Sequence, residues 1–103
     1  MIKHINSDEF NKILEENEDV FIVDFYADWC GPCRMLAPTI ESVAQKTEGK
    51  VDVYKVNVDD CPNIAVEYQI SSVPTVMVFD KGEVVSTMVG LQPEESYMSA
   101  LKM

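Results

Sequence analysis

Runs of apolar residues along the chain predict strands, and these runs are separated by segments with helical spacing. Val20 to Tyr26 is a nearly continuous apolar, β-branched and aromatic run, which predicts a strand buried on both faces. Val51 to Val58 predicts a second central strand. Thr75 to Phe79 and Glu83 to Val89 predict two further strands, and the short link Asp80-Lys81-Gly82 favours an antiparallel hairpin between them.

Three short segments have the features of helices. Asn6 and Glu9 have the spacing of a capping box at the start of the first. Pro62 predicts the start of the second, which should end near Tyr68, and Pro93 with the two acids after it opens the last. The expected apolar faces are Phe10, Ile13 and Leu14 in the first helix, and Tyr97, Met98, Ala100 and Leu101 in the last.

A longer helix is expected from Cys33 to about Glu48. Pro32 suits the first helical position because its missing N–H needs no partner there, and Gly49 suits the end of the helix. Pro38 lies inside the segment and should kink it, because proline cannot donate to the carbonyl four residues earlier. The apolar face of this helix is Leu36, Ile40, Val43 and Ala44.

Strands that alternate with helices and end in a hairpin and a helix predict an α/β three-layer sandwich. Its sheet should be mixed, parallel at the centre and antiparallel at one edge. No repeat, low-complexity tract or linker interrupts the 103 residues, so we expect one domain over residues 1–103.

Composition narrows the function classes. Eighteen acidic residues against eight basic ones give a formal charge of −10, which argues against a nucleic-acid partner. The same charge favours solubility, or selection of partners with basic docking faces. Three cysteines do not make a secreted disulfide scaffold, and neither a signal peptide nor a membrane span is expected. We therefore expect a soluble, cytoplasmic protein that works as a monomer.

The candidate chemistry lies in Cys30-Gly31-Pro32-Cys33, where the first buried strand turns into the long helix. Unpaired amides and the dipole at a helix N-terminus stabilise an anion, so Cys30 should be the reactive thiolate. Pro32 has no N–H, which leaves the amide of Cys33 as a donor to the Cys30 sulfur. Cys33, three residues later on the same helix face, can reach Cys30 and expel a target held as a mixed disulfide.

Half of a zinc site is the alternative reading of this C-x-x-C spacing. Two more ligands would be needed, and His4 and Cys61 are the only other histidine and cysteine in the chain. We therefore expect neither a metal nor a cofactor. Cys61 follows two aspartates that disfavour a thiolate, so it is interpreted as an incidental thiol, with an intermolecular disulfide as the alternative.

Four residues near the motif are further candidates. Asp24 is an acid inside a strand that ought to be buried, so its pKa should be raised and it could exchange a proton near neutrality, or it could cap a nearby loop. Lys55 in the neighbouring strand could pair with Asp24 or lie in solvent. Trp29 is either a core residue or an exposed docking residue. Pro74 could simply open a strand, and the sequence alone does not make its peptide bond cis.

The chain resembles the thioredoxin family, and the resemblance runs through almost all of it. Its centre is Trp29-Cys30-Gly31-Pro32-Cys33, and the order and spacing of several other landmarks agree. These are Val23 to Asp28, Ala37-Pro38, Lys55 to Asp59, Val73-Pro74-Thr75, Phe79 with Gly82, and Val89-Gly90.

This resemblance implies a five-stranded mixed sheet with helices on both faces. It implies that Cys30 attacks, Cys33 resolves and Asp24 accepts the proton of Cys33, while a cis Pro74 presents the backbone of Val73 to an extended substrate. A flat apolar docking surface would consist of Trp29, Gly31, Pro32, Val73, Pro74, Gly90 and Leu91. The implied activity is the reduction of disulfides in client proteins, with a separate thioredoxin reductase, usually an NADPH-dependent flavoprotein, regenerating the dithiol.

The sequence departs from the family pattern at a few positions. Tyr26 stands where many members have Trp, Gln69 where Gly is frequent and Arg34 where Lys is common. Cys61 is extra, and the last helix stops early at Met103. Two rival functions remain open at this point: an oxidase or isomerase of the same fold, and a binding module that uses only the apolar patch.

Overall fold

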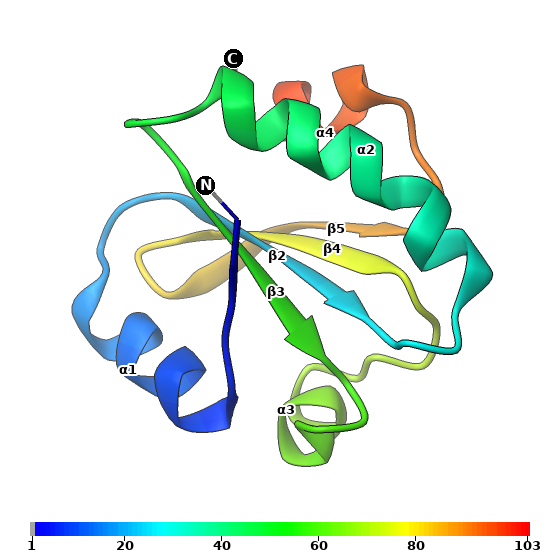
Figure 1. Cartoon of the computed structure of the whole chain (residues 1–103). Coiled ribbons are helices and arrows are strands. Elements are labelled where there is room, and N and C mark those ends of the chain that lie inside the picture. The colour runs from blue at the N-terminus through cyan, green and yellow to red at the C-terminus, as the bar shows by residue number, and fades with distance from the viewer. Residues whose placement is uncertain (1) are drawn as a thin grey trace.

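A five-stranded mixed sheet with helices on both faces forms the described part of the chain, residues 2–103 of a computed structural model (Figure 1). Helices α1 and α3 cover one face, and α2 and α4 cover the other. In chain order the elements are β1 (Ile2–His4), α1 (Ser7–Glu16), β2 (Phe21–Tyr26), α2 (Gly31–Lys46), β3 (Asp52–Asn57), α3 (Pro62–Glu67), β4 (Thr75–Asp80), β5 (Glu83–Val89) and α4 (Glu94–Ala100).

The strand order is β1-β3-β2-β4-β5. Strands β1, β3 and β2 are parallel, whereas β4 is antiparallel to both β2 and β5. The predicted mixed sheet and the hairpin of β4 and β5 are confirmed. The sequence pattern did not predict β1, because this strand has only three residues and two of them, Lys3 and His4, are exposed.

The predicted helices are confirmed with small shifts at their ends. Asn6 caps α1 in a complete capping box with Glu9. Helix α2 begins at Gly31 rather than Cys33, because Cys30 is its N-cap residue, and it ends at Lys46 rather than near Glu48. Pro38 lies inside this helix, as its sequence position indicates.

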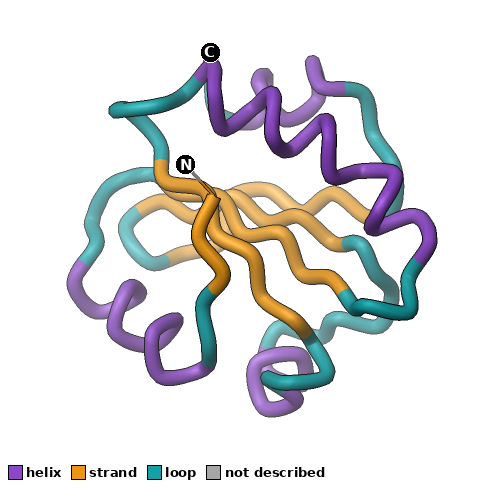
Figure 2. Tube along the Cα trace, in the orientation of Figure 1, coloured by secondary structure: helices purple, strands orange, loops and turns teal. Residues whose placement is uncertain are grey.

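Two hydrophobic cores lie on opposite faces of the sheet, between the strands and the helices that Figure 2 shows on either side of them. The core under α1 and α3 is aromatic: the ring of Phe10 meets those of Phe25, Tyr68 and Phe79 edge to face. The core under α2 and α4 is mainly aliphatic. Strand β2 contributes to both, since its residues from Phe21 to Phe25 are all buried.

Gln69, which departs from the family pattern, has an unusual backbone conformation in this fold. Gln69 follows α3 with a φ angle of +56°, in the left-handed region where a side chain is disfavoured. This backbone conformation explains why glycine suits the position. The chain nevertheless places a glutamine there, and its side chain is exposed.

We predict that Phe10→Ala destabilises the protein by about 3–5 kcal/mol, because it empties the centre of the aromatic core. Urea unfolding followed by circular dichroism measures this change. Val66→Ala, at a position 78% exposed in α3, is the control and should change the free energy of unfolding by less than about 0.5 kcal/mol. Equal effects of the two substitutions would contradict the assignment of Phe10 to the core.

Candidate active site

Cys30 and Cys33 form a disulfide at the point where the chain leaves β2 and enters α2. Cys30 is the N-cap residue of α2, and its sulfur accepts a hydrogen bond from the backbone N–H of Cys33 at 3.1 Å. This is the donor expected from the sequence. In the reduced protein the same N–H and the dipole of the 16-residue helix are placed to stabilise negative charge on the Cys30 sulfur.

The two cysteines are almost fully buried, with exposed fractions of 3% and 4%. They form a small cluster with Ala27, against which Tyr26 and Val73 pack. The Cys30 sulfur lies 3.5 Å from the backbone carbonyl oxygen of Val73. The segment before β4 therefore lies directly beside the Cys30 sulfur.

The peptide bond between Val73 and Pro74 is cis, as the family resemblance implies. The Pro74 carbonyl accepts a hydrogen bond of 2.9 Å from the N–H of Gly90, a residue with a φ angle of +79°. This bond ties the end of β5 to the segment beside the disulfide. Pro74 itself is buried, so it orients the Val73 backbone and does not form part of the exposed surface.

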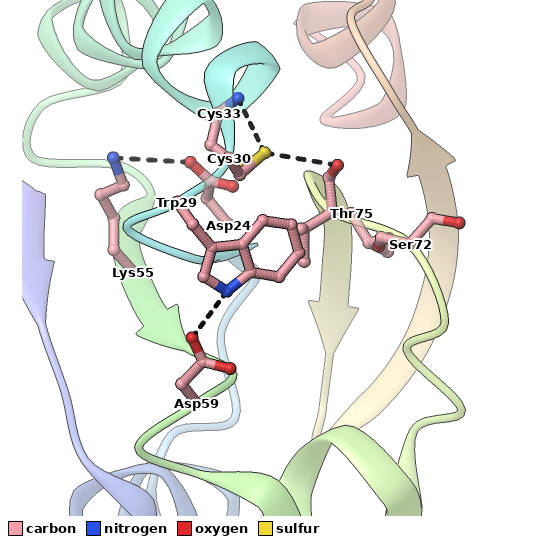
Figure 3. The surroundings of a disulfide bond; sticks show 9 residues. Asp24, Trp29, Cys30, Cys33, Lys55, Asp59, Ser72 and Thr75 are labelled. Carbon is pink, nitrogen blue, oxygen red and sulfur yellow. Dashed lines mark hydrogen bonds and ion pairs between the residues drawn. A yellow bond between two sulfur atoms is a disulfide. The ribbon is translucent and has the colours of Figure 1, made fainter.

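Trp29 is 68% exposed, which settles its place as a surface residue. Its indole Nε1–H donates a hydrogen bond of 2.9 Å to Oδ2 of Asp59, which follows β3 (Figure 3). Asp59 was not predicted as a site residue, because nothing in its sequence neighbourhood shows that it would reach the indole. Its hydrogen bond fixes the orientation of a large aromatic side chain beside Cys30.

Asp24 is 1% exposed, and neither carboxyl oxygen has a hydrogen-bond partner in the described part of the chain. Burial raises the pKa of this carboxyl group from 3.8 to about 6, even though Lys55 acts in the opposite direction. The Lys55 Nζ lies 3.7 Å from Oδ2 of Asp24, and its side chain is only 14% exposed. The predicted pairing is confirmed, and the interpretation of Lys55 as a solvated surface residue was wrong.

A surface cleft of about 210 Å³ brings Cys33 and Lys55 together, with Tyr26 and Arg34 also in its lining. Figure 3 shows the Asp24 carboxyl group on the same side of the sheet, between Lys55 and the cysteine pair. The buried acid, its cationic partner and the second cysteine of the motif thus belong to one site.

Cys61 lies outside this site. It is buried in the aromatic core and has no disulfide partner in residues 2–103, so the intact fold does not present it to a second molecule. Within the same residues, no three His, Cys, Asp or Glu side chains are grouped to hold a metal ion. None of the helices described is both long and apolar enough to span a membrane.

The structure brings most of the sequence-predicted site residues to one end of the sheet. Gly31 and Pro32 are exposed beside Trp29, Val73 and Gly90 are half-buried, and Leu91 is 46% exposed. Two further exposed apolar residues, Met35 and Val89, were not predicted. Met35 lies in α2 and Val89 in β5. Apolar residues of such elements are expected in the core, so the sequence pattern did not indicate that these two would be exposed.

Comparison with known proteins gives a consistent result. A family model described as Thioredoxin matches residues 1–103. The chain is 43% identical over 98 residues to a thioredoxin of Rickettsia felis, covering 95% of this chain and 93% of that protein. It is 40% identical over 100 residues to a thioredoxin of Porphyra purpurea, covering 97% and 94%. The crystal structure of Malassezia sympodialis thioredoxin matches with a TM-score of 0.88 and 33% identity, over 99% of this chain and 90% of that one.

We predict that Asp24→Asn removes a pH dependence of stability. The folded protein keeps a proton on Asp24 up to about pH 6, whereas the unfolded chain loses it near 3.8, so the wild type loses stability as pH rises through this window. One pKa unit corresponds to about 1.36 kcal/mol. The free energy of unfolding of Asp24→Asn, relative to that of the wild type, should therefore increase by about 2–3 kcal/mol from pH 3.5 to pH 8. Urea denaturation of the oxidised proteins at both pH values measures it. A constant difference would show that Asp24 titrates normally.

Proposed function

Since the chain belongs to the thioredoxin family, we propose that it reduces disulfide bonds of client proteins with Cys30 as the attacking thiol and Cys33 as the resolving thiol. A thiol–disulfide oxidoreductase of this family needs two cysteines at bonding distance, which this chain has. The observation that carries the assignment of roles is the position of Cys30 at the N-cap of α2, with the Cys33 N–H on its sulfur.

The exchange proceeds in two displacements. The Cys30 thiolate attacks one sulfur of the client disulfide, which forms a mixed disulfide and releases the first client thiolate. The Cys33 thiol then loses its proton, and the resulting thiolate attacks the Cys30 sulfur. This step forms the Cys30–Cys33 disulfide and releases the second client thiolate, so two electrons pass from the dithiol to the client.

Asp24 is the proposed acceptor of the Cys33 proton. Its pKa of about 6 makes it ionised at neutral pH yet a much better base than an ordinary aspartate. Lys55 stabilises the ionised carboxylate before transfer, because its ammonium group lies 3.7 Å away. The cleft that Cys33 and Lys55 share with solvent provides a route by which the proton can leave.

The proposed client surface surrounds Cys30. The backbone carbonyl of Val73, 3.5 Å from the Cys30 sulfur, lies where an extended client segment could pair with it. Trp29, Pro32, Leu91 and Val89 add exposed apolar area around this point. A surface of this kind recognises backbone and apolar contacts rather than one particular side chain, which suits a reductase with several clients.

Membership of the family implies disulfide substrates and a reductase partner in general terms. We propose more narrowly that an NADPH-dependent flavoprotein reductase regenerates the dithiol, and that the chain acts as a monomeric domain over residues 1–103 in the cytoplasm. All five strands belong to a single sheet, which supports one domain. The unpaired Cys61 fits a reducing compartment.

The test is the reduction of insulin disulfides with dithiothreitol as electron source. Wild type should precipitate insulin chains well above the dithiothreitol background, and Cys30→Ser should fall to that background. Cys33→Ser should accumulate mixed disulfides with insulin that survive non-reducing electrophoresis, because the resolving thiol is missing.

Cys61→Ala is the matched control, since it also removes a cysteine but leaves the site unchanged, and it should keep wild-type turnover. Insulin reduction by the wild type no faster than the background would reject the reductase function. Full activity of Cys30→Ser would reject its role as the attacking thiol.

A further inference from the structure

Three side chains lie in one row across the parallel half of the sheet. His4 in β1 pairs in register with Lys55 in β3, and Lys55 pairs in register with Asp24 in β2. Tyr26 is two residues beyond Asp24, so both side chains leave β2 on the same face. Lys55 therefore lies between an exposed histidine and the buried acid, with a tyrosine beside it.

Tyr26 contacts both of its neighbours in this row. The Nζ atom of Lys55 lies over the Tyr26 ring, 4.9 Å from its centroid, which is cation–π geometry. The Tyr26 hydroxyl is 3.1 Å from Nδ1 of His4, and the His4 ring meets the Tyr26 ring edge-on at 5.8 Å. The tyrosine ring is thus fixed by β1 and supports a lysine of β3.

Lys55 borders two surface clefts, so its flexible side chain has solvent-accessible space on both sides of its observed position. Tyr26 and Lys55 line both the 210 Å³ cleft that contains Cys33 and a second cleft of about 240 Å³ on the side of His4. No hydrogen bond joins Lys55 to Asp24, since their 3.7 Å separation is that of an ion pair alone. A long lysine side chain gains entropy by moving into solvent, so a further contact is needed to keep it beside the acid.

We propose that Tyr26, anchored by His4, is a positioning residue that holds the Lys55 ammonium group beside the Asp24 carboxyl group during thiol–disulfide exchange. The inference rests on the proposed role of Asp24 as acceptor of the Cys33 proton. Tyr26 acts through Lys55 and touches neither the client nor the sulfur that attacks it.

The surrounding charges are consistent with this role. Burial and the nearby acids raise the pKa of Tyr26, so its hydroxyl stays protonated and remains a partner for His4. The ionisable groups that face the row are Cys33 and Arg34 from α2, Asp28 from the loop before it, Glu9 from α1, Asp60 after β3 and Tyr97 from α4. Lys55 is the cation that interacts with the Asp24 carboxylate among these groups.

The test compares the titration of Asp24 in Tyr26 variants by carboxyl ¹³C NMR, together with the pH profile of insulin reduction. Tyr26→Leu and Tyr26→Gln remove the ring, so Lys55 moves away and the Asp24 midpoint should rise by about 0.4–0.7 pH unit, the shift that an exposed cation–π contact corresponds to. The pH profile should move in the same direction. Tyr26→Trp keeps an aromatic face and should restore the wild-type midpoint.

The anchor is tested separately. Tyr26→Phe and His4→Ala each keep the ring but lose the contact between the hydroxyl and the imidazole, so each should give a smaller upward shift. The double variant should shift no further than either alone, because both remove the same contact. Tyr68→Leu, which removes a half-buried tyrosine from the core on the opposite face, is the matched control and should leave the Asp24 midpoint unchanged.

Wild-type midpoints in Tyr26→Leu and Tyr26→Gln would overturn the inference and leave the proposed function intact, provided that Asp24→Asn still alters the pH profile. A profile that Asp24→Asn does not alter would instead reject the proton-accepting role of Asp24, and the inference with it. An equal midpoint shift in Tyr68→Leu would also overturn the inference, since the effect would then follow general destabilisation.

Discussion

Burial of the central strand β2 on both faces is the constraint on which the rest of the structure depends. A strand with α1 and α3 on one side and α2 and α4 on the other must be almost wholly apolar, and only Asp24 breaks this pattern. The same strand ends where α2 begins, so the redox cysteines follow from its last residues. The one carboxyl group that the fold desolvates, that of Asp24, therefore lies near the cysteine pair. In the proposed exchange, this is where the Cys33 thiol has to lose its proton.

Two kinds of electrostatic support meet at this junction. Helix α2 offers backbone N–H groups to Cys30, and this support depends on local chain geometry alone. Lys55 offers a charge to Asp24, and this support depends on the register of β2 with β3. The first stabilises negative charge on the Cys30 sulfur, and the second lowers the pKa of the buried Asp24 carboxyl group. The different roles that we propose for the two cysteines rest on this difference, although only two residues separate them in the sequence.

The departures from the family pattern differ in whether they contact the residues around the cysteine pair. Gln69 occupies a left-handed position just after α3, and its consequence is limited to local backbone energy. Cys61 is enclosed in the aromatic core. Tyr26 differs, because its ring lies under the Lys55 ammonium group and its hydroxyl reaches His4. The tyrosine at position 26, which replaces one aromatic residue by another, thus contacts the lysine that pairs with the buried Asp24.

Short-range sequence signals determined the four helices and every strand except β1. They also determined the capping box at Asn6, the place of Cys30 at the N-terminus of its helix and the burial of Asp24. Each of these depends on residues a few positions apart, for which spacing and side-chain chemistry are sufficient. Tertiary structure alone decided four contacts of the site. They are the ion pair of Asp24 with Lys55, the hydrogen bond from Trp29 to Asp59, the contact of Val73 with Cys30, and the row of side chains from His4 to Asp24. These contacts join residues far apart in the chain, and the register between strands, which no local pattern encodes, brings them together.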